Sequence, residues 1–328
     1  MYEIMIWELF ILITLVWLLF ASISDLRTRE VPNWLNFSMI AIGLGGRLIY
    51  SIISSNYSIF IYGILGFGIF LIIANILYYA KQWGGGDAKL LMGMGALYGN
   101  YQGVSFLNPV LDLPFLLILI INIFIAGTFY GLIYSLYLAL KNRNEFVKQL
   151  RKESLKEFLF GVSAGVMIII TGFIFYDLIG IIIIIFGTIL LLFSIVYLFL
   201  KVVEKSCMYK KINISELSEG DWIAEDIKVK NKLVYRSMEK YKWPNFLKYK
   251  KHYSIYNRLK YMLKKEKTKY SNLGVSKEDV KRLKNYKVKY VVIKDGIPFV
   301  PSFLFGFVAT IIYGNLFFLF KAFFLQSF

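Results

Sequence analysis

Long apolar runs are the feature that most limits what this chain can fold into. The chain has 328 residues, 58% of them apolar, and its mean hydropathy of +0.59 is above that of ordinary soluble domains. Its apolar segments lie near 4–24, 34–54, 58–80, 89–107, 114–140, 158–176, 178–200 and 299–325. Several approach or exceed the roughly 20 apolar residues with which a helix crosses a bilayer. We therefore expect an all-α polytopic membrane bundle with about eight transmembrane helices.

The charged residues divide this bundle into parts. Residues 201–298 hold 26 Lys/Arg against 11 Asp/Glu, so they carry +15 of the net charge of +17. A helical "SKEDVKRL" and an alternating "KVKYVVI" predict a small α+β domain there. We expect a membrane core at 1–140, a basic cytoplasmic connection with two further transmembrane helices at 141–200, the basic cytoplasmic α+β domain at 201–298, and a last transmembrane helix at 299–328.

The composition also narrows the partners and cofactors. A basic segment beside a membrane suits anionic lipid headgroups, and no recognition motif points to nucleic acid. With one cysteine, Cys207, and one histidine, His252, the chain cannot build a zinc site from soft ligands. We expect no metal or other cofactor, so any chemistry must rest on carboxylates, lysines or hydroxyls.

Lysine and arginine orient the predicted spans. They occur in the connections at 25–33, 81–88 and 141–157 and in the segment at 201–298, whereas the alternate connections near 55–57, 108–113 and 177 have none. Because cytoplasmic loops carry the excess of positive charge, we expect the N-terminus outside and the basic segments in the cytoplasm. This places both Asp25 and Asp87 at the cytoplasmic face.

These two carboxylates stand where apolar runs meet polar connections. Asp25 lies at the end of the first run, and Pro32 forces Val31 into an extended conformation, so the first helix must end near here. Asp87 follows Gly84–Gly86, which offer positive φ angles and room for another chain to approach closely. The second motif therefore suits a position where an extended peptide lies against an aspartate.

Two carboxylates at one membrane depth have a defined chemistry. Side by side they share a proton, so that one can activate water while the other polarises a peptide carbonyl. A transporter or channel also uses intramembrane carboxylates and broken helices, and a lone aspartate at a helix end is commonly a cap. The spacing alone leaves these alternatives open.

A resemblance to a known family favours the proton-sharing pair of carboxylates. Gly84-Gly85-Gly86-Asp87 resembles the GxGD signature of intramembrane aspartic proteases, and the following Ala88-Lys89-Leu90-Leu91 is similar to type IV prepilin and archaeal preflagellin peptidases. Asp25 with Val31-Pro32-Asn33 resembles their first-aspartate motif. "EGDWIAEDI" and "DGIPFVPSFLFGF" resemble the C-terminal region of the archaeal branch, where a small cytoplasmic domain leads into a final helix through a Pro-Phe-x-Pro turn.

The resemblance implies an aspartic endopeptidase that removes the leader of pilin-like or flagellin-like precursors at the cytoplasmic face. Asp25 and Asp87 would be the catalytic pair, and Gly84, Gly85 and Gly86 the loop that the substrate approaches. Residues with a possible supporting role are Lys89, Pro32, Asn33, Pro298 and Pro301. Lys89 has the alternative of reaching the headgroups with its long side chain.

Departures from related patterns refine this expectation. The bacterial enzymes often carry a four-cysteine insert and also N-methylate their product, and one cysteine cannot supply that insert, so we expect no methylation. A presenilin-like protease of other membrane helices is the alternative within the same class, although Ser24-Asp25 is not its Tyr-Asp motif and no Pro-Ala-Leu occurs. The two spans within 158–200 favour a prepilin over a dedicated preflagellin enzyme.

Overall fold

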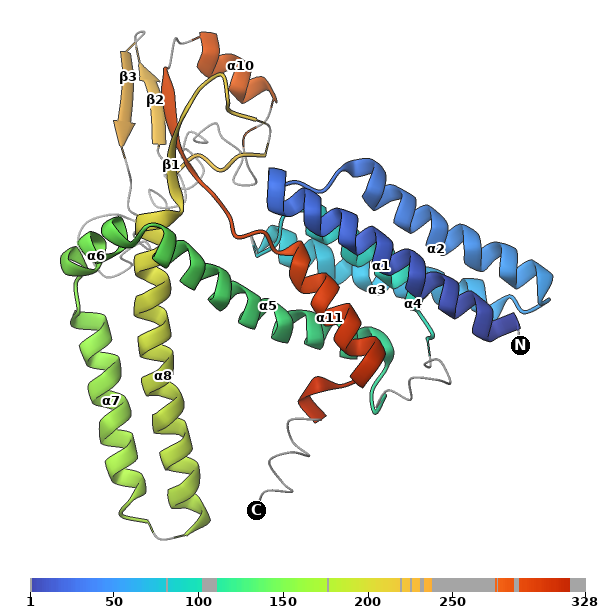
Figure 1. Cartoon of the computed structure of the whole chain (residues 1–328), viewed down its shortest axis with the longest axis horizontal. Helices are drawn as coiled ribbons and strands as arrows, with labels where there is room; N and C mark the ends of the chain where they lie inside the picture. Colours follow the sequence, from blue (N-terminus) through green and yellow to red (C-terminus); the bar gives the residue numbers. More distant parts are fainter. Residues whose placement is uncertain are drawn as a thin grey trace, which may run out of the picture. The chain divides into compact units, whose positions relative to one another are not determined.

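The computed structural model describes residues 2–80, 82–101, 111–175, 177–218, 220–224, 226–230, 233–237, 275, 277–285 and 289–318. Two compact units divide the chain, one of Met1–Tyr134 with Ile297–Phe328 and the other of Ser135–Gly296. The first unit contains α1 (Tyr2–Thr28), α2 (Asn33–Ile53), α3 (Ser58–Tyr79), α4 (Gly85–Tyr98), most of α5 (Phe115–Lys141) and α11 (Val300–Tyr313) (Figure 1). The second contains α6 (Arg143–Lys152), α7 (Lys156–Gly172), α8 (Leu178–Cys207), β1 (Tyr209–Asn213), β2 (Asp226–Lys230), β3 (Leu233–Ser237), α10 (Lys277–Asn285) and β4 (Tyr290–Lys294).

The helices are those of an integral membrane protein, but eight full crossings are not confirmed. Within the described residues, α1, α2, α3, α5 and α8 are long and apolar enough to span a bilayer, and α6 with α7 forms a sixth candidate that is bent by 78°. The predicted fourth and last spans correspond to α4 and α11, of 14 residues each. At 1.5 Å per residue these helices are about 21 Å long, less than the roughly 30 Å of a hydrocarbon core.

Helix α4 is the centre of the first unit. Apart from Lys89 and Met92, every residue from Ala88 to Tyr98 is buried, and α2 and α3 pack against it. Gly66 of α3 lies so close to α4 that a methyl group there would collide with the carbonyl oxygen of Gly95. Such small residues let helix backbones approach closely in a membrane. The helix is therefore enclosed by protein.

A buried arginine closes the C-terminal end of α4. Arg47 of α2 is fully buried and donates to the carbonyl oxygen of Leu97 from Nε at 3.1 Å and from Nη2 at 2.7 Å. Its Nη1 donates to the carbonyl oxygen of Ile59 and to Oδ1 of Asn100, both at 2.8 Å. The cation thus satisfies a carbonyl that the last turn of a helix leaves unpaired, and it does so at the negative end of the helix dipole.

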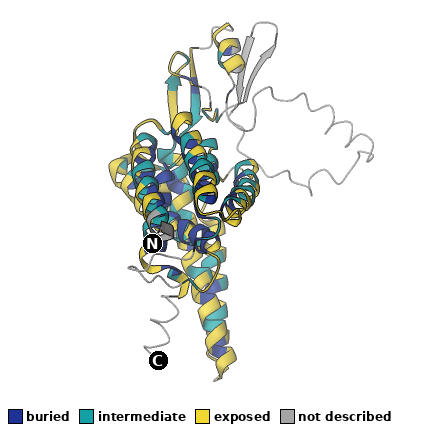
Figure 2. Cartoon of the chain, turned by 90° about the vertical axis from the view of Figure 1, so that its right-hand side faces the viewer, coloured by how far each residue is buried: buried dark blue, intermediate teal, exposed yellow. Residues whose placement is uncertain are grey.

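The second unit combines a helical hairpin with a small α+β part. Helices α7 and α8 pack through glycines, among them Gly165 against Gly187, while their bulky side chains stay largely exposed (Figure 2). Beyond α8, β1 pairs with β4 and β2 with β3, each antiparallel. Leu217, Val275, Leu283 and Val291 form a small separate core beneath α10 and β4. This part is the small α+β region that the sequence predicts, within the residues that the structure describes.

Candidate active site

Asp25 lies on the last turn of α1, just before the chain reverses. Arg29, with φ of 61°, follows the end of α1, and Pro32 is the N-cap residue of α2. Asp25 is only 6% exposed, and its Oδ2 accepts a hydrogen bond of 3.0 Å from the backbone N–H of Val300. The carboxylate is therefore held by a residue from the distant end of the same unit.

The Pro-Phe-Val-Pro segment, Pro298 to Pro301, explains why Val300 is the donor. Phe299 is the N-cap residue of α11, and Val300 is its first helical residue. The first N–H groups of a helix have no partner within the helix, and proline has no N–H at all. Because Pro301 has no N–H, the donors that this turn offers to Asp25 come from Val300, at 3.0 Å, and from Phe299 before it.

Asp87 is held in a matching way within its own helix. It is the third residue of α4, and its Oδ2 accepts a hydrogen bond of 2.9 Å from the backbone N–H of Gly84. Its side chain is half-buried, and the charge of Asp25 acts on it. The two aspartates, 62 positions apart in the sequence, are thus electrostatic neighbours in the fold.

Two further contacts join the motifs that carry these aspartates. A Cβ atom on Gly86 would lie 3.0 Å from Cβ of Val31, so the absence of a side chain lets the two segments meet. Nζ of Lys89 donates to Oδ1 of Asn33 over 2.6 Å. Lys89 also lies 5.3 Å from the ring centre of Phe37. The polar end of Lys89 is therefore engaged with the first motif.

The three glycines of the loop have different surroundings. Gly86 faces Val31, whereas a Cβ atom on Gly85 would come no closer than 3.8 Å to Tyr78. A Cβ atom on Gly84 would lie 3.4 Å from Oδ2 of Asp87, an ordinary contact. Space beside the loop is thus found at Gly84 and Gly85, and Gly86 serves the packing of the two motifs.

An aromatic cluster around Trp83 connects the glycine loop to the proline turn. Trp83 is only 5% exposed, and its ring centre lies 5.7 Å from that of Phe299 and 5.1 Å from that of Phe303. It also stacks on Phe124 of α5 at 5.6 Å. The sequence gives no signal for this role, because a tryptophan at a membrane boundary is usually read as an interfacial anchor.

Helix α5 adds two tyrosines to the surroundings of Asp25. Nη2 of Arg29 donates to the hydroxyl of Tyr134 over 2.6 Å, and Tyr130 stands one turn earlier, with its ring centre 5.9 Å from that of Tyr134. The charge of Arg29 acts on Asp25, and the charge of Asp25 acts on Tyr130. These polar groups were not singled out from the sequence, because nothing in the spacing of α5 distinguishes them from lipid-facing aromatics.

The arrangement supplies two carboxylates and little that would bind a metal. Within the described part of the chain, no group of three or more His, Cys, Asp or Glu side chains could hold a metal ion. Each aspartate instead receives a backbone N–H, which fixes one of its oxygens. Two coupled carboxyl groups of this kind can divide the roles of base and acid.

The region that carries both aspartate motifs is similar to known proteins. The model of the type IV leader peptidase family matches residues 12–136. Residues 12–136 are thus similar to the type IV leader peptidase family over a segment that contains both aspartate motifs. The chain is similar to the preflagellin peptidase of Methanococcus voltae, with 34% identity over 149 residues, which are 45% of this chain and 62% of that protein. It is similar to the preflagellin peptidase of Methanocaldococcus jannaschii, with 32% identity over 145 residues, 43% of this chain and 62% of that protein.

A more distant relative carries the other name of the family. The prepilin peptidase EppA of Methanothermobacter thermautotrophicus is 31% identical over 154 residues, 43% of this chain and 40% of that protein. The chain thus spans about three fifths of the preflagellin peptidases that it matches. No solved structure matches it significantly.

Proposed function

We propose that this protein is a membrane aspartic endopeptidase that removes the leader of pilin-like or flagellin-like precursors, with Asp25 and Asp87 as its catalytic pair. The observation that carries the proposal is the meeting of the two aspartate motifs inside a leader peptidase segment. Gly86 packs on Val31, Lys89 binds Asn33, and the charge of Asp25 reaches Asp87.

The chemistry follows from a shared proton. The ionised carboxylate takes a proton from water, and the protonated one donates a hydrogen bond to the carbonyl oxygen of the scissile peptide bond. The backbone donors at Val300 and Gly84 do not titrate, so they hold Oδ2 of each aspartate in the same place throughout this exchange. Lys89, Asn33, Pro32, Pro298 and Pro301 act by positioning these two groups.

The substrate must offer an extended peptide at the depth of the two carboxyls. A helical peptide bond is engaged in its own hydrogen bonds and is poorly open to water, so a short leader before a transmembrane helix is a suitable target. The relatives are named for preflagellin and prepilin, which have this form by the family resemblance. The space at Gly84 and Gly85 suits the close approach of such a chain.

Co-expression with a panel of pilin-like and flagellin-like precursors tests the activity. Asp25→Asn and Asp87→Asn should each abolish the mobility shift of the cleaved precursor, because each proton role needs its own carboxyl group. Asp177→Asn is the matched control: Asp177 caps α8 through Gly180, and asparagine caps equally well. Near-normal turnover in either single variant would refute the pair. Cleavage should persist in detergent, where no ion gradient exists, whereas an activity that depends on an ion gradient would point to a transporter.

The intact mass of the product tests the reaction more finely. We expect a cut at the cytoplasmic edge of the substrate helix and a product without an added methyl group. A cut near the middle of the helix would favour the presenilin-like alternative. A product heavier by one methyl group would overturn the assignment of a peptidase without methyltransferase activity.

Cysteine labelling tests the sidedness, in a Cys207→Ser background. A cysteine at Asn56 should react with an impermeant thiol reagent added to intact cells, and one at Asn144 should not. This expectation rests on the asymmetry of lysine and arginine between alternate connections. Labelling of the Asn144 position from outside would put the candidate site on the wrong face.

A further inference from the structure

Helix α6 lies at a sharp bend beside the apolar hairpin of the second unit. Its axis is inclined by 78° to α7, which begins four residues after α6 ends. The bulky side chains of α7 and α8 are largely exposed, so these helices suit a lipid environment. A helix nearly perpendicular to a membrane-crossing helix runs close to the plane of the membrane surface.

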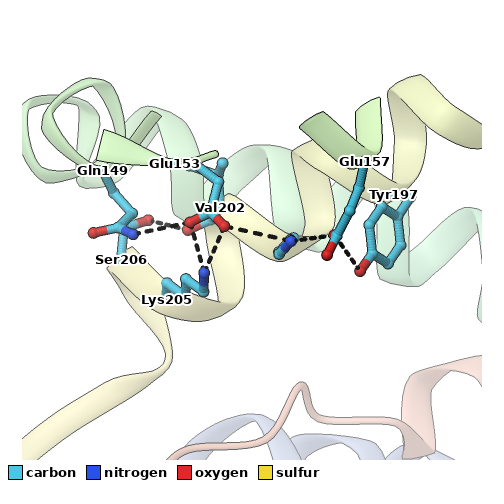
Figure 3. Close-up of polar contacts among 8 residues, drawn as sticks. Gln149, Glu153, Glu157, Tyr197, Val202, Lys205 and Ser206 are labelled. Atoms are coloured by element: carbon cyan, nitrogen blue, oxygen red, sulfur yellow. Dashed lines mark hydrogen bonds and ion pairs between the residues drawn. The ribbon is translucent and has the colours of Figure 1, made fainter. Parts of the chain in front are cut away.

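One face of α6 is occupied by α8. The ring centre of Phe146 lies 5.9 Å from that of Phe199, and Nε2 of Gln149 donates to Glu153 over 3.2 Å. Figure 3 shows Glu153 between Gln149 and Lys205, whose Nζ donates to both carboxylate oxygens at 2.6 Å. These contacts fix the rotation of α6 about its own axis.

The opposite face of α6 is exposed and mainly basic, with the exposed Glu145 at its edge. Its side chains stand at the spacings of three and four residues that place them on one face of a helix. They line an open hollow of about 560 Å³ and comprise Arg143, Asn144, Val147, Lys148, Arg151 and Lys152. We call these six residues the α6 basic face. Four of them are cationic and none is acidic.

The neighbouring carboxylate does not neutralise this face. Burial alone would raise the pKa of the Glu153 carboxyl, but the hydrogen bonds and charge of Lys205, with help from Lys201, hold that pKa below its usual value. Glu153 is thus an ionised partner of α8 lysines, and Lys201 also pairs with Glu157 at 2.5 Å. Within the part of the chain that the structure describes, none of the ion pairs involves a cation of the α6 basic face.

We propose that the α6 basic face binds the phosphate headgroups of anionic membrane lipids. Basic side chains near an anionic bilayer surface each add a favourable interaction, and a helix lying in the interface presents them at headgroup depth. Val147 lies among the cations, and Leu150 and Leu155 nearby are 37% and 44% exposed. Such apolar groups suit the upper part of acyl chains. The site is independent of the proposed peptidase activity, because no residue of the candidate active site takes part in it.

Native mass spectrometry of the full-length, delipidated protein tests this inference. Phosphatidylglycerol should bind more tightly than phosphatidylcholine, and R143Q/K148Q/R151Q/K152Q should weaken phosphatidylglycerol binding by about tenfold or more. Glutamine is a good helix former and leaves the contacts of Phe146 and Glu153 with α8 in place. The matched control, K277Q/K281Q/K284Q/K289Q, removes the same charge from α10 and from Lys289 just before β4, and it should weaken binding clearly less than the α6 variant does.

Two additional measurements separate the site from general charge effects. R143K/R151K should retain binding, because the headgroup is recognised by charge. A photoreactive phosphatidylglycerol analogue should crosslink to residues 143–152 of the wild-type protein. Unchanged lipid affinity in the glutamine variant, an equal loss in the control, crosslinks confined to other segments, or equal competition by inorganic phosphate would each overturn the proposal.

Discussion

The helix pairs α3–α4 and α7–α8 both pack through glycines, but one pair is buried within the protein and the other is exposed. In both, glycines bring two backbones together, Gly66 with Gly95 in one pair and Gly165 with Gly187 in the other. Helix α4 is then covered on its remaining sides by α2 and neighbouring side chains, whereas α7 and α8 keep their bulky residues exposed. Close glycine packing therefore says that two helices touch, and the surroundings decide whether the pair becomes a core or a lipid-facing hairpin.

Their polar side chains differ as well. Around α4, the first unit buries Thr14, Arg47 and Ser51, and Tyr98 bonds to Thr14 at 2.7 Å. Along the described parts of α7 and α8, Ser194 is the one polar residue that is buried. Polar groups inside a membrane protein are costly unless they are paired, and they tend to mark functional regions. The enclosed pair carries Asp87, and the exposed pair carries no candidate catalytic group.

Removing Arg47 should break the enclosed pair most severely. Arg47→Met leaves the carbonyl oxygens of Leu97 and Ile59 without this partner, and we expect a loss of about 3 kcal/mol or more together with loss of activity. Lys201→Met is the counterpart in the exposed pair, and it should cost less than about 1 kcal/mol. Thermal unfolding in detergent measures both. Equal losses would mean that the burial of Arg47 has no energetic consequence.

Adding one methyl group to each glycine interface should lower the stability of both variants but lower cleavage activity in only one. Gly66→Ala pushes on the backbone of Gly95, and Gly165→Ala would place a Cβ atom 3.0 Å from the carbonyl oxygen of Gly187. Each should lower stability by about 1–3 kcal/mol. Precursor cleavage should fall about tenfold or more for Gly66→Ala and stay within about twofold for Gly165→Ala, because only α4 carries Asp87. A larger loss of cleavage in the hairpin variant would contradict this division.

The loop before α4 allows a finer test. Gly86→Ala should reduce cleavage about tenfold, because the new methyl group would lie 3.0 Å from Cβ of Val31 and would separate the two motifs. Gly45→Ala, with no atom within 4 Å of the new methyl group, is the matched control and should cleave nearly normally. Gly85→Ala, with 3.8 Å to its nearest neighbour, leaves the packing intact and tests the space offered to the substrate. Val31→Ala combined with Gly86→Ala should recover part of the activity. Failure of this rescue together with an inactive Gly85→Ala would assign the loop to substrate binding alone.

The smallest effect concerns the hydrogen bond between the motifs. Asn33→Ala and Lys89→Met should each lower kcat/KM several-fold, and the double variant should lose little more than either single variant. The coupling should be about 1 kcal/mol, the usual net value of one hydrogen bond, because this one is exposed to solvent. Strictly additive losses would show that Lys89 acts elsewhere, for example on lipid headgroups.

The positions of the helices were predictable from the sequence, but their lengths and surroundings were not. Hydropathy located the segments of α1, α2, α3, α5 and α8, since lipid-facing helices are apolar throughout. It also located the apolar runs that contain α4 and α11 but left the crossing by the fourth run open, because an apolar run does not reveal that Arg47 binds the last turn of α4 or that Gly314, with φ of 75°, follows α11. The charge pattern could not show that Arg47 is buried in the protein.

The sequence predicted that the two candidate carboxylates would lie near each other, and the charge of Asp25 does act on Asp87, but it did not predict what holds them. Their supports were hidden for a physical reason: the donors are backbone N–H groups at Val300 and Gly84, and every residue except proline has one. Trp83 was hidden for another, because its burial depends on the rings of Phe299 and Phe303.

The hydrogen bond from Val300 to Asp25 joins a residue made early in translation to one made near its end. The donor is synthesised 275 residues after the acceptor. At about 5–20 residues per second, the ribosome needs roughly 15–55 s to cover that interval. Throughout it, α1 to α5 can pack while the carboxylate of Asp25 still lacks this donor. The order of translation therefore makes the candidate site one of the last features of the first unit to be completed, after the whole second unit has been made.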